Sequence, residues 1–220
     1  MWKFAAVGVI IGVVVIFGFS LIDGGTEGEV TAQAVIAAPQ TDLNGYTRAD
    51  APYTWVFPRD HGAHDSFQTE WWYYTGNLAT ADGRRFGYQF TVFRRAITSQ
   101  DAPTVSEWRS NQVYMAHFTL SDVGATTFYH DERYSRGAAG LAGALPSAAN
   151  PDALYQVYLE DWQITATDAA ATQFTLNARS PQGFAVTLTL DLSKTPALQG
   201  EGGLSHKSSD PGNASYYYSL

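Results

Sequence analysis

Residues 184–192 read FAVTLTLDL, and a large apolar side chain occupies every second position from Phe184 to Leu192. Alanine, threonine and aspartate stand between these positions. Successive side chains of an extended chain point to opposite faces, so a period of two indicates a β-strand with one buried face. This stretch predicts the fold class, because no helical period of 3.6 residues fits it.

The same alternation recurs toward the N-terminus. It is found at residues 86–92, 114–120, 158–164 and 174–178, with Glu160 as an exception to the apolar pattern. Turn signals separate these stretches at Asp82-Gly83, at residues 122–124, at Asp168 and at residues 180–183. Connections this short favour antiparallel neighbours, because a parallel crossover needs a dozen or more residues.

Seven or eight such strands fit either a closed barrel or a sandwich. A barrel of this size removes exposed sheet edges and holds one small ligand, as in lipocalins. The chain has 13 Tyr, 12 Phe and 6 Trp, more rings than most cores need. We therefore expect an all-β, antiparallel lipocalin-like β-barrel with a cavity, and keep a sandwich as the alternative. Residues 137–151, rich in Gly, Ala and Pro, predict a long loop or lid.

The charge balance and the residue types exclude several functions. The net charge is −8 and only three lysines are present, so binding of nucleic acid by neutralising phosphates is not expected. No cysteine occurs, which excludes disulfides, thiolate metal sites and a cysteine nucleophile. The sequence has no G-x-S-x-G, P-loop, G-x-G-x-x-G or H-E-x-x-H motif, and we expect no cofactor.

An apolar segment begins the chain. Residues 4–22 carry no charge, follow Lys3 and precede Asp23, and as a helix they would span about 28 Å of a hydrocarbon core of about 30 Å. Residues 1–22 thus predict either a membrane anchor or a signal peptide, with Ala32-Gln33-Ala34 as a cleavage site in the second case. Either way, the body is predicted to be exported to the periplasmic or extracellular face. Residues 23–51 are predicted as a linker, and 52–220 as the folded domain.

The densest chemistry lies in residues 61–78, HGAHDSFQTEWWYYTGNL. In a strand that starts near residue 69, Glu70, Trp72 and Tyr74 share one face, and the other carries Trp71, Tyr73 and Asn77. Two large rings on each face suggest that both faces are covered by other elements. Alternatively, one face lines a pocket for an apolar ligand, in which tyrosine hydroxyls and indole N–H groups bind its polar atoms.

Three other polar residues of this region are candidates for chemistry. Glu70 facing an apolar cavity would be an acid with a raised pKa; the alternative is an ion pair with Arg94 or Arg95. His64, with His61 and neighbouring aspartates, has an H-x-x-H spacing that is not diagnostic of a metal, and hydrogen bonds that hold a loop explain it as well. His117 lies within an apolar strand, where a structural role competes with that of a base.

Several motifs together resemble one family. They are Phe57-Pro58, DHGAH at 60–64, TEWWYYTGNL at 69–78, residues 114–122, GLSHK at 203–207 and residues 211–219. These motifs resemble the AttH/CrtC-like family, which contains carotenoid 1,2-hydratases and proteins named only as secreted hydrolases. The resemblance runs from about residue 52 to residue 220.

The resemblance implies a fold of two packed lipocalin-like barrels, of which this chain would contain the first. It also implies hydration of an isoprenoid double bond or hydrolysis, without a redox cofactor. In that chemistry Glu70 would be the acid, and His117 or His64 would act on the water. The rings of Trp71, Trp72, Tyr73 and Tyr74 would stabilise a cation and, with Asn77, line the ligand.

Three functions remain open at this point. The first is an exported domain that binds an apolar, isoprenoid or lipid-like molecule, with or without catalysis. The second is a non-catalytic accessory domain that hands a lipid or lipoprotein to an ABC-type transporter permease, as the gene neighbourhood of some family members implies. The third is a structural half whose partner barrel carries the site.

Overall fold

The computed structural model describes residues 45–99, 106–209 and 212–220. The predicted leader (1–22) and most of the predicted linker (23–51) lie outside these residues. Within them, no helix has the length and apolarity needed to cross a membrane. The regular secondary structure of the described chain is antiparallel β-strand apart from one short 3₁₀ helix, η1 (Arg59–His61). This confirms the predicted all-β, antiparallel class.

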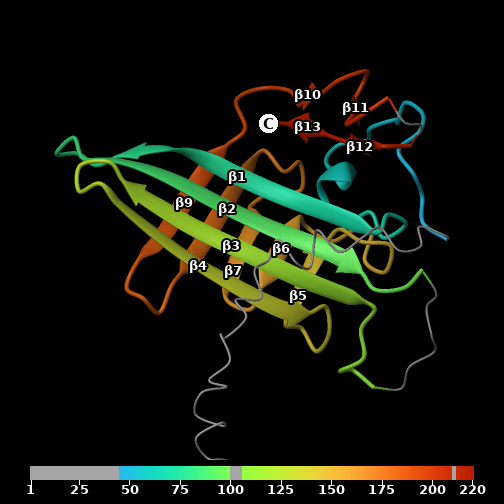
Figure 1. The fold of residues 1–220 in the computed structure, drawn as a ribbon, viewed down its shortest axis with the longest axis horizontal. Coiled ribbons are helices and arrows are strands. Elements are labelled where there is room, and N and C mark those ends of the chain that lie inside the picture. Colours follow the sequence, from blue (N-terminus) through green and yellow to red (C-terminus); the bar gives the residue numbers. More distant parts are fainter. Residues whose placement is uncertain (1–44, 100–105, 210–211) are drawn as a thin grey trace, which may run out of the picture. The chain divides into compact units, whose positions relative to one another are not determined.

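The first sheet contains four long strands in sequence order. They are β1 (Thr69–Ala79), β2 (Arg85–Ala96), β3 (Gln112–Asp122) and β4 (Thr127–Arg136). Each strand pairs antiparallel with the next, and the β1–β2 register places Glu70 opposite Arg94. The predicted alternation holds, because Tyr88, Phe90 and Val92 on the inner face of β2 are buried. Figure 1 shows these strands running side by side.

The second sheet contains five shorter strands, also in sequence order. They are β5 (Ala142–Leu145), β6 (Gln156–Leu159), β7 (Trp162–Ala166), β8 (Gln173–Arg179) and β9 (Ala185–Asp191). Two expectations were wrong here. Residues 158–164 are not one strand, because Glu160 adopts a positive φ of 56° and turns the chain between β6 and β7. The predicted loop at 137–151 contains β5, whose Ala142 and Ala144 are buried in the core.

The C-terminal segment forms two short strand pairs beside η1 (Figure 1). β10 (Ala197–Leu198) pairs with β13 (Tyr218–Ser219), and β11 (Leu204–His206) pairs with β12 (Ala214–Tyr216). Side chains tie this segment to the residues that precede η1. The Trp55 Nε1 donates to the Gly202 carbonyl at 3.0 Å, and the Tyr216 hydroxyl donates to the Ala51 carbonyl at 2.6 Å.

The inner faces of the two sheets share one core. Trp162 of the second sheet packs edge-on against Phe90 and Phe118 of the first, with ring centroids 6.3 and 5.8 Å apart, and all three side chains are 0% exposed. Among the described residues, no strand pairing joins the two sheets. The predicted closed barrel is therefore wrong: the sheets pack face to face as a sandwich, and large rings fill the space where a ligand cavity was expected.

Candidate functional site

The candidate site is built on the loop between η1 and β1. Gly62 lets this loop lie directly on the loop that follows β5, because a Cβ at Gly62 would overlap the Pro146 carbonyl. The Ala63 amide donates to that same carbonyl at 2.8 Å. The loop is thus fixed against the second sheet at one end and enters the first sheet at the other.

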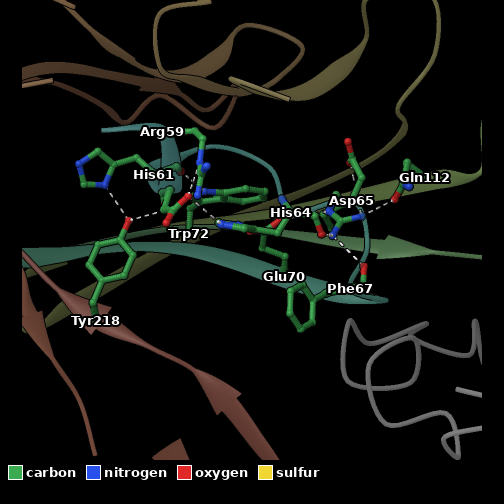
Figure 2. A network of polar contacts seen from close by, with 11 residues as sticks. Arg59, His61, His64, Asp65, Phe67, Glu70, Trp72, Gln112 and Tyr218 are labelled. Atoms are coloured by element: carbon green, nitrogen blue, oxygen red, sulfur yellow. Dashed lines mark hydrogen bonds and ion pairs between the residues drawn. The ribbon is translucent and has the colours of Figure 1, made fainter. Parts of the chain in front are cut away.

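A buried arginine of β2 holds the rest of this loop. Arg94 is 0% exposed. One of its terminal nitrogens donates to the carbonyls of His64 and Phe67, both at 2.9 Å, and the other donates to Gln112 Oε1 at 2.9 Å. Figure 2 labels three of these partners, Gln112, Phe67 and His64. The desolvated guanidinium is compensated by this set of acceptors together with the carboxylate of Glu70.

Glu70 lies at the start of β1 and is held by two neighbours. Its Oε2 accepts a bond from the Arg94 Nε at 3.3 Å and from the His64 backbone N–H at 3.0 Å. Its Oε1 lies 2.6 Å from His64 Nδ1. The ion pair with Arg94, left open by the sequence as the alternative to a free acid, is present. Both carboxylate oxygens are therefore engaged by groups of this chain.

His64 lies between two carboxylates. Its Nδ1 faces Glu70, and its Nε2 lies 3.7 Å from the Oδ1 of Asp60. Burial lowers the pKa of His64, but the hydrogen bond and charge of Glu70, aided by Asp60, outweigh it and raise the pKa above its usual value. Asp60 is itself buried and accepts from the Val56 amide at 2.7 Å and from Arg59 Nε at 2.8 Å. The imidazole therefore holds its second proton more strongly than a free histidine does.

His61 lies three residues before His64, and its pKa shifts in the opposite direction. Burial lowers its pKa to about 4, against the opposing charge of Asp60. Its Nδ1 lies 2.7 Å from the hydroxyl of Tyr218, and its carbonyl accepts a bond from Trp72 Nε1 at 2.9 Å (Figure 2). At neutral pH His61 is thus a neutral imidazole that links the C-terminal segment to β1.

A pair of buried phenols lies deeper between the sheets. The hydroxyls of Tyr74 on β1 and Tyr155 before β6 are hydrogen-bonded to each other. Burial raises the pKa of both well above the usual tyrosine value. The Tyr155 ring also lies edge-on to His61, with centroids 6.1 Å apart. Both phenols are neutral hydroxyls at any ordinary pH.

A cluster of half-buried aromatic rings lies beside His64, and two of its rings contact the imidazole. We call it the ring cluster, which consists of Tyr53, Trp55, Phe57, Phe67 and Tyr216. Tyr53 and Phe67 flank the imidazole of His64, with centroids 6.2 and 6.4 Å from it. Tyr216 contacts both of these rings, at 5.1 and 5.7 Å. The cluster is an apolar surface, partly open to solvent, beside a charged pair.

The structure brings some of the predicted site residues together. Glu70, His64 and Trp72 belong to this network (Figure 2), and by the alternation of β1 Tyr74 lies on the same inner face. The alternating burial of β1 places the remaining candidates of that strand on the opposite face. Trp71 and Tyr73 are 38% and 49% exposed there, and Asn77 is also exposed. These two rings are not covered by an element of the described chain, contrary to the expectation that both faces are covered.

His117 belongs to that outer face as well. It is paired in register with Thr91 and Glu132, and its Nε2 lies 3.5 Å from Glu132 Oε2. Burial lowers the pKa of His117, with Glu132 opposing. His117 and Glu70 are on opposite faces of the first sheet, so the structure does not place them in one site.

Sequence reasoning missed the parts of the site that come from distant segments. Tyr216 and Tyr218 are more than 145 positions from the site loop; the C-terminal strand pairs bring Tyr216 against Phe67 and Tyr218 against His61. The motif at residues 211–219 is recognisable in the sequence, but nothing in its spacing indicates which residues it contacts. Tyr53, Trp55 and Phe57 alternate in sequence, and this is the one signal that could have identified a shared ring face.

The residues do not form a metal site of ordinary composition. Across the described part of the chain, no group of three or more His, Asp or Glu side chains is arranged to hold a metal ion. The arrangement offers a proton-bearing imidazole, supported by a carboxylate and placed next to an apolar surface. It can bind a molecule with an apolar body and a polar end, and exchange a proton with that end.

Comparisons with known proteins place this arrangement in context. A model of the AttH-like family matches residues 48–220. The crystal structure of a candidate AttH protein from Nitrosomonas europaea is 31% identical, with a TM-score of 0.60, and the match covers 76% of this chain. The matched part is 48% of that protein, so this chain spans about half of its length. No curated protein matches the sequence.

Proposed function

This chain belongs to the AttH-like family, and from that premise we propose that it is an exported domain that binds an apolar, isoprenoid or lipid-like ligand at the ring cluster. The single observation that carries the proposal is the placement of half-buried rings around the His64–Glu70 pair. Soluble domains rarely leave several large rings partly open side by side unless they contact a partner or a ligand.

The proposed ligand has an apolar body and one polar end. Tyr53, Phe67 and Tyr216 would contact the apolar body, since aromatic rings offer a large contact area with few rotatable bonds. The imidazole of His64 is partly exposed and would donate a hydrogen bond to a hydroxyl or carboxylate. This end of the molecule replaces the barrel interior as the place where a ligand is expected.

The geometry also changes the catalytic roles that the sequence suggested for Glu70 and His64. The carboxylate of Glu70 accepts bonds from Arg94 and His64, so it acts by orienting the imidazole and stabilising its charged form. We infer that His64 is the proton donor in any hydration or hydrolysis at this site and that Glu70 is the positioning residue. Attachment to a membrane through residues 4–22 is part of the same proposal.

Two experiments on the full chain in a mild detergent test the proposal. Native mass spectrometry after gentle extraction should show a retained apolar molecule. A titration with farnesol, a C15 isoprenoid alcohol, should then give saturable binding. Replacing Phe67→Ala should weaken it roughly tenfold, because the substitution removes the larger part of one ring contact of about 1.5 kcal/mol.

Phe128→Ala is the matched control. Phe128 is an exposed ring of β4 that lies away from the ring cluster. Partition of farnesol into detergent weakens the apparent affinity of all variants equally, so the ratio between the two variants is the readout. Equal binding by Phe67→Ala, Phe128→Ala and the unchanged chain, with circular dichroism showing all three folded, would contradict the proposal.

A further inference from the structure

The outer face of the first sheet carries a continuous apolar row. In the strand register, Trp71 lies opposite Phe93, Phe93 opposite Met115, and Met115 opposite Tyr134. The row therefore crosses all four strands. At its two ends Trp71 and Tyr134 are 38% and 39% exposed; β1 supplies the core from its other face through Trp72, and β4 supplies no buried residue. Core packing does not account for these two rings.

The neighbouring row of the same face is cationic. The register aligns Arg95 of β2 with Val113 of β3, and Val113 with Arg136 of β4. No carboxylate among the described residues pairs with Arg95 or Arg136. Arg85 lies farther along the same face of β2 and also has no carboxylate partner among the described residues, whereas Glu132 on this face accepts a hydrogen bond from the Tyr134 hydroxyl at 3.4 Å. Two unpaired guanidinium groups thus lie beside the apolar row of a chain whose net charge is −8.

Two more exposed apolar side chains lie past the cationic row, where β2 leads toward β3. Ile97 is 66% exposed and Trp108 is 64% exposed. The Ile97 amide donates to the Asn111 carbonyl at 2.8 Å, so the chain leaving β2 pairs with the chain entering β3 two residues after Arg95. An exposed isoleucine and an exposed tryptophan at the end of a hairpin are costly in water and are typical of a contact surface.

We propose that this outer patch, defined as Trp71, Phe93, Tyr134, Arg95 and Arg136, docks on a lipid bilayer that contains anionic headgroups, and that the exposed Trp108 of the connection between β2 and β3 enters the same interface. Tryptophan and tyrosine are enriched at the interface between headgroups and acyl chains, because one end of each ring is apolar and the other is polar. Arginine binds phosphate oxygens in a bidentate manner and is attracted by anionic lipid. The two unpaired arginines provide the charge complementarity that selects this partner.

The test measures the depth of named tryptophans in vesicles. Vesicle attachment alone does not report on this face, because the full chain also carries the apolar segment 4–22. The full chain is therefore reconstituted in vesicles of dibrominated phosphatidylcholine, with or without 30% phosphatidylglycerol. Bromine quenches only indoles that enter the interface. We expect stronger quenching with the anionic lipid, and Trp71→Phe and Trp108→Phe should each remove a quenched part of the emission.

Charge variants test the cationic row. Arg95→Gln with Arg136→Gln should lower the docking equilibrium about fivefold for each arginine, since an arginine near such a surface contributes on the order of 1 kcal/mol. Arg179→Gln with Lys194→Gln changes the net charge equally at exposed positions in β8 and after β9 of the second sheet, and should leave the quenching unchanged. Equal quenching for both double variants, or quenching that does not depend on Trp71 and Trp108, overturns the proposal. Unquenched Trp71 and Trp108 in anionic vesicles overturn it too, and indicate a protein partner.

Discussion

The two sheets of the sandwich differ in their outer faces. On the second sheet the outer positions of β7, β8 and β9 are polar: Gln163, Thr165, Thr175, Asn177, Thr187 and Thr189. On the first sheet the corresponding face carries Trp71, Tyr73, Phe93 and Tyr134. Threonine and glutamine on a strand are ordinary solvated residues. The aromatic face therefore needs a partner to explain it, and the polar face does not.

The inner faces differ as well. The inner side of the second sheet is apolar throughout its central strands, where Val157, Ile164 and Leu176 are 0% exposed. The first sheet has an apolar centre, but at one end it buries the Glu70–Arg94 ion pair. Buried charge seldom improves stability over an apolar pair of equal size. We infer that the second sheet is mainly scaffold, whereas the first carries the functional residues.

The largest expected effect tests the polar end of the first sheet. Arg94→Met should lower the free energy of unfolding by about 3–5 kcal/mol, because it leaves the Glu70 carboxylate without its cation and releases the carbonyls of His64 and Phe67. Urea unfolding measures this. The double variant Arg94→Met with Glu70→Gln should recover part of the loss. A loss below about 1 kcal/mol for Arg94→Met would show that the Glu70–Arg94 ion pair does not stabilise the fold in the way described.

The pH dependence of stability separates the two histidines of the loop. The pKa of His61 is about 4 in the folded chain, against an ordinary 6.5, so the unfolded chain takes up a proton first. Stability is therefore lost as the pH falls from 6.5 toward 4, by up to about 3 kcal/mol at 1.36 kcal/mol per pH unit. Urea midpoints across this range measure the slope, and His61→Gln should flatten it.

His64 should contribute with the opposite sign. Its pKa is raised in the folded chain, so its stabilising contribution is complete below pH 6.5 and is lost as the pH rises through the raised value. His64→Gln should therefore abolish the gain in stability as the pH falls from the raised pKa to 6.5, and leave the slope between pH 6.5 and 4 unchanged. An unchanged profile in both variants would mean that neither imidazole is in the environment described.

The smallest of these effects tests the contact between the loop that joins η1 to β1 and the loop that follows β5. Gly62→Ala should destabilise by about 1–3 kcal/mol, because the new Cβ meets the Pro146 carbonyl and the loop must shift. Gly87→Ala is the matched control, since a Cβ there meets only the Ser121 Cβ at 3.8 Å. Thermal unfolding of the two variants gives the comparison. Equal melting temperatures would show that the close contact between Gly62 and Pro146 does not contribute to stability.

Much of the fold could be predicted from the sequence because burial of a strand face is a local property. The alternation at 86–92 and 184–192 gives the strands and their inner faces directly. The choice between barrel and sandwich could not be predicted, because it depends on which strand edges pair. Glu160 shows a second limit: a turn made by a positive φ at a charged residue does not interrupt the spacing of apolar residues strongly enough to be recognised.

The candidate site was partly predictable for the same reason. Glu70 and Arg94 are register partners in adjacent strands, and His64 is six positions from Glu70, so short-range reasoning could consider both contacts. The ring cluster and Tyr218 depend on the C-terminal segment folding back along residues 51–61, which no local pattern encodes. The sequence also does not indicate which face of β1 is buried, since each face carries two large rings.

The most direct test of the central claim uses four of the five histidines as reporters. His61 and His64 lie in the candidate site, and His117 and His130 lie on the outer face of the first sheet. In a titration of the full chain with farnesol, followed by NMR of the imidazole Cε1–H groups, the His64 signal should shift saturably, with a smaller shift at His61. His117 and His130 should not move. Shifts confined to His117 and His130, or no saturable shift at His64, would contradict the claim that the ligand binds at the ring cluster.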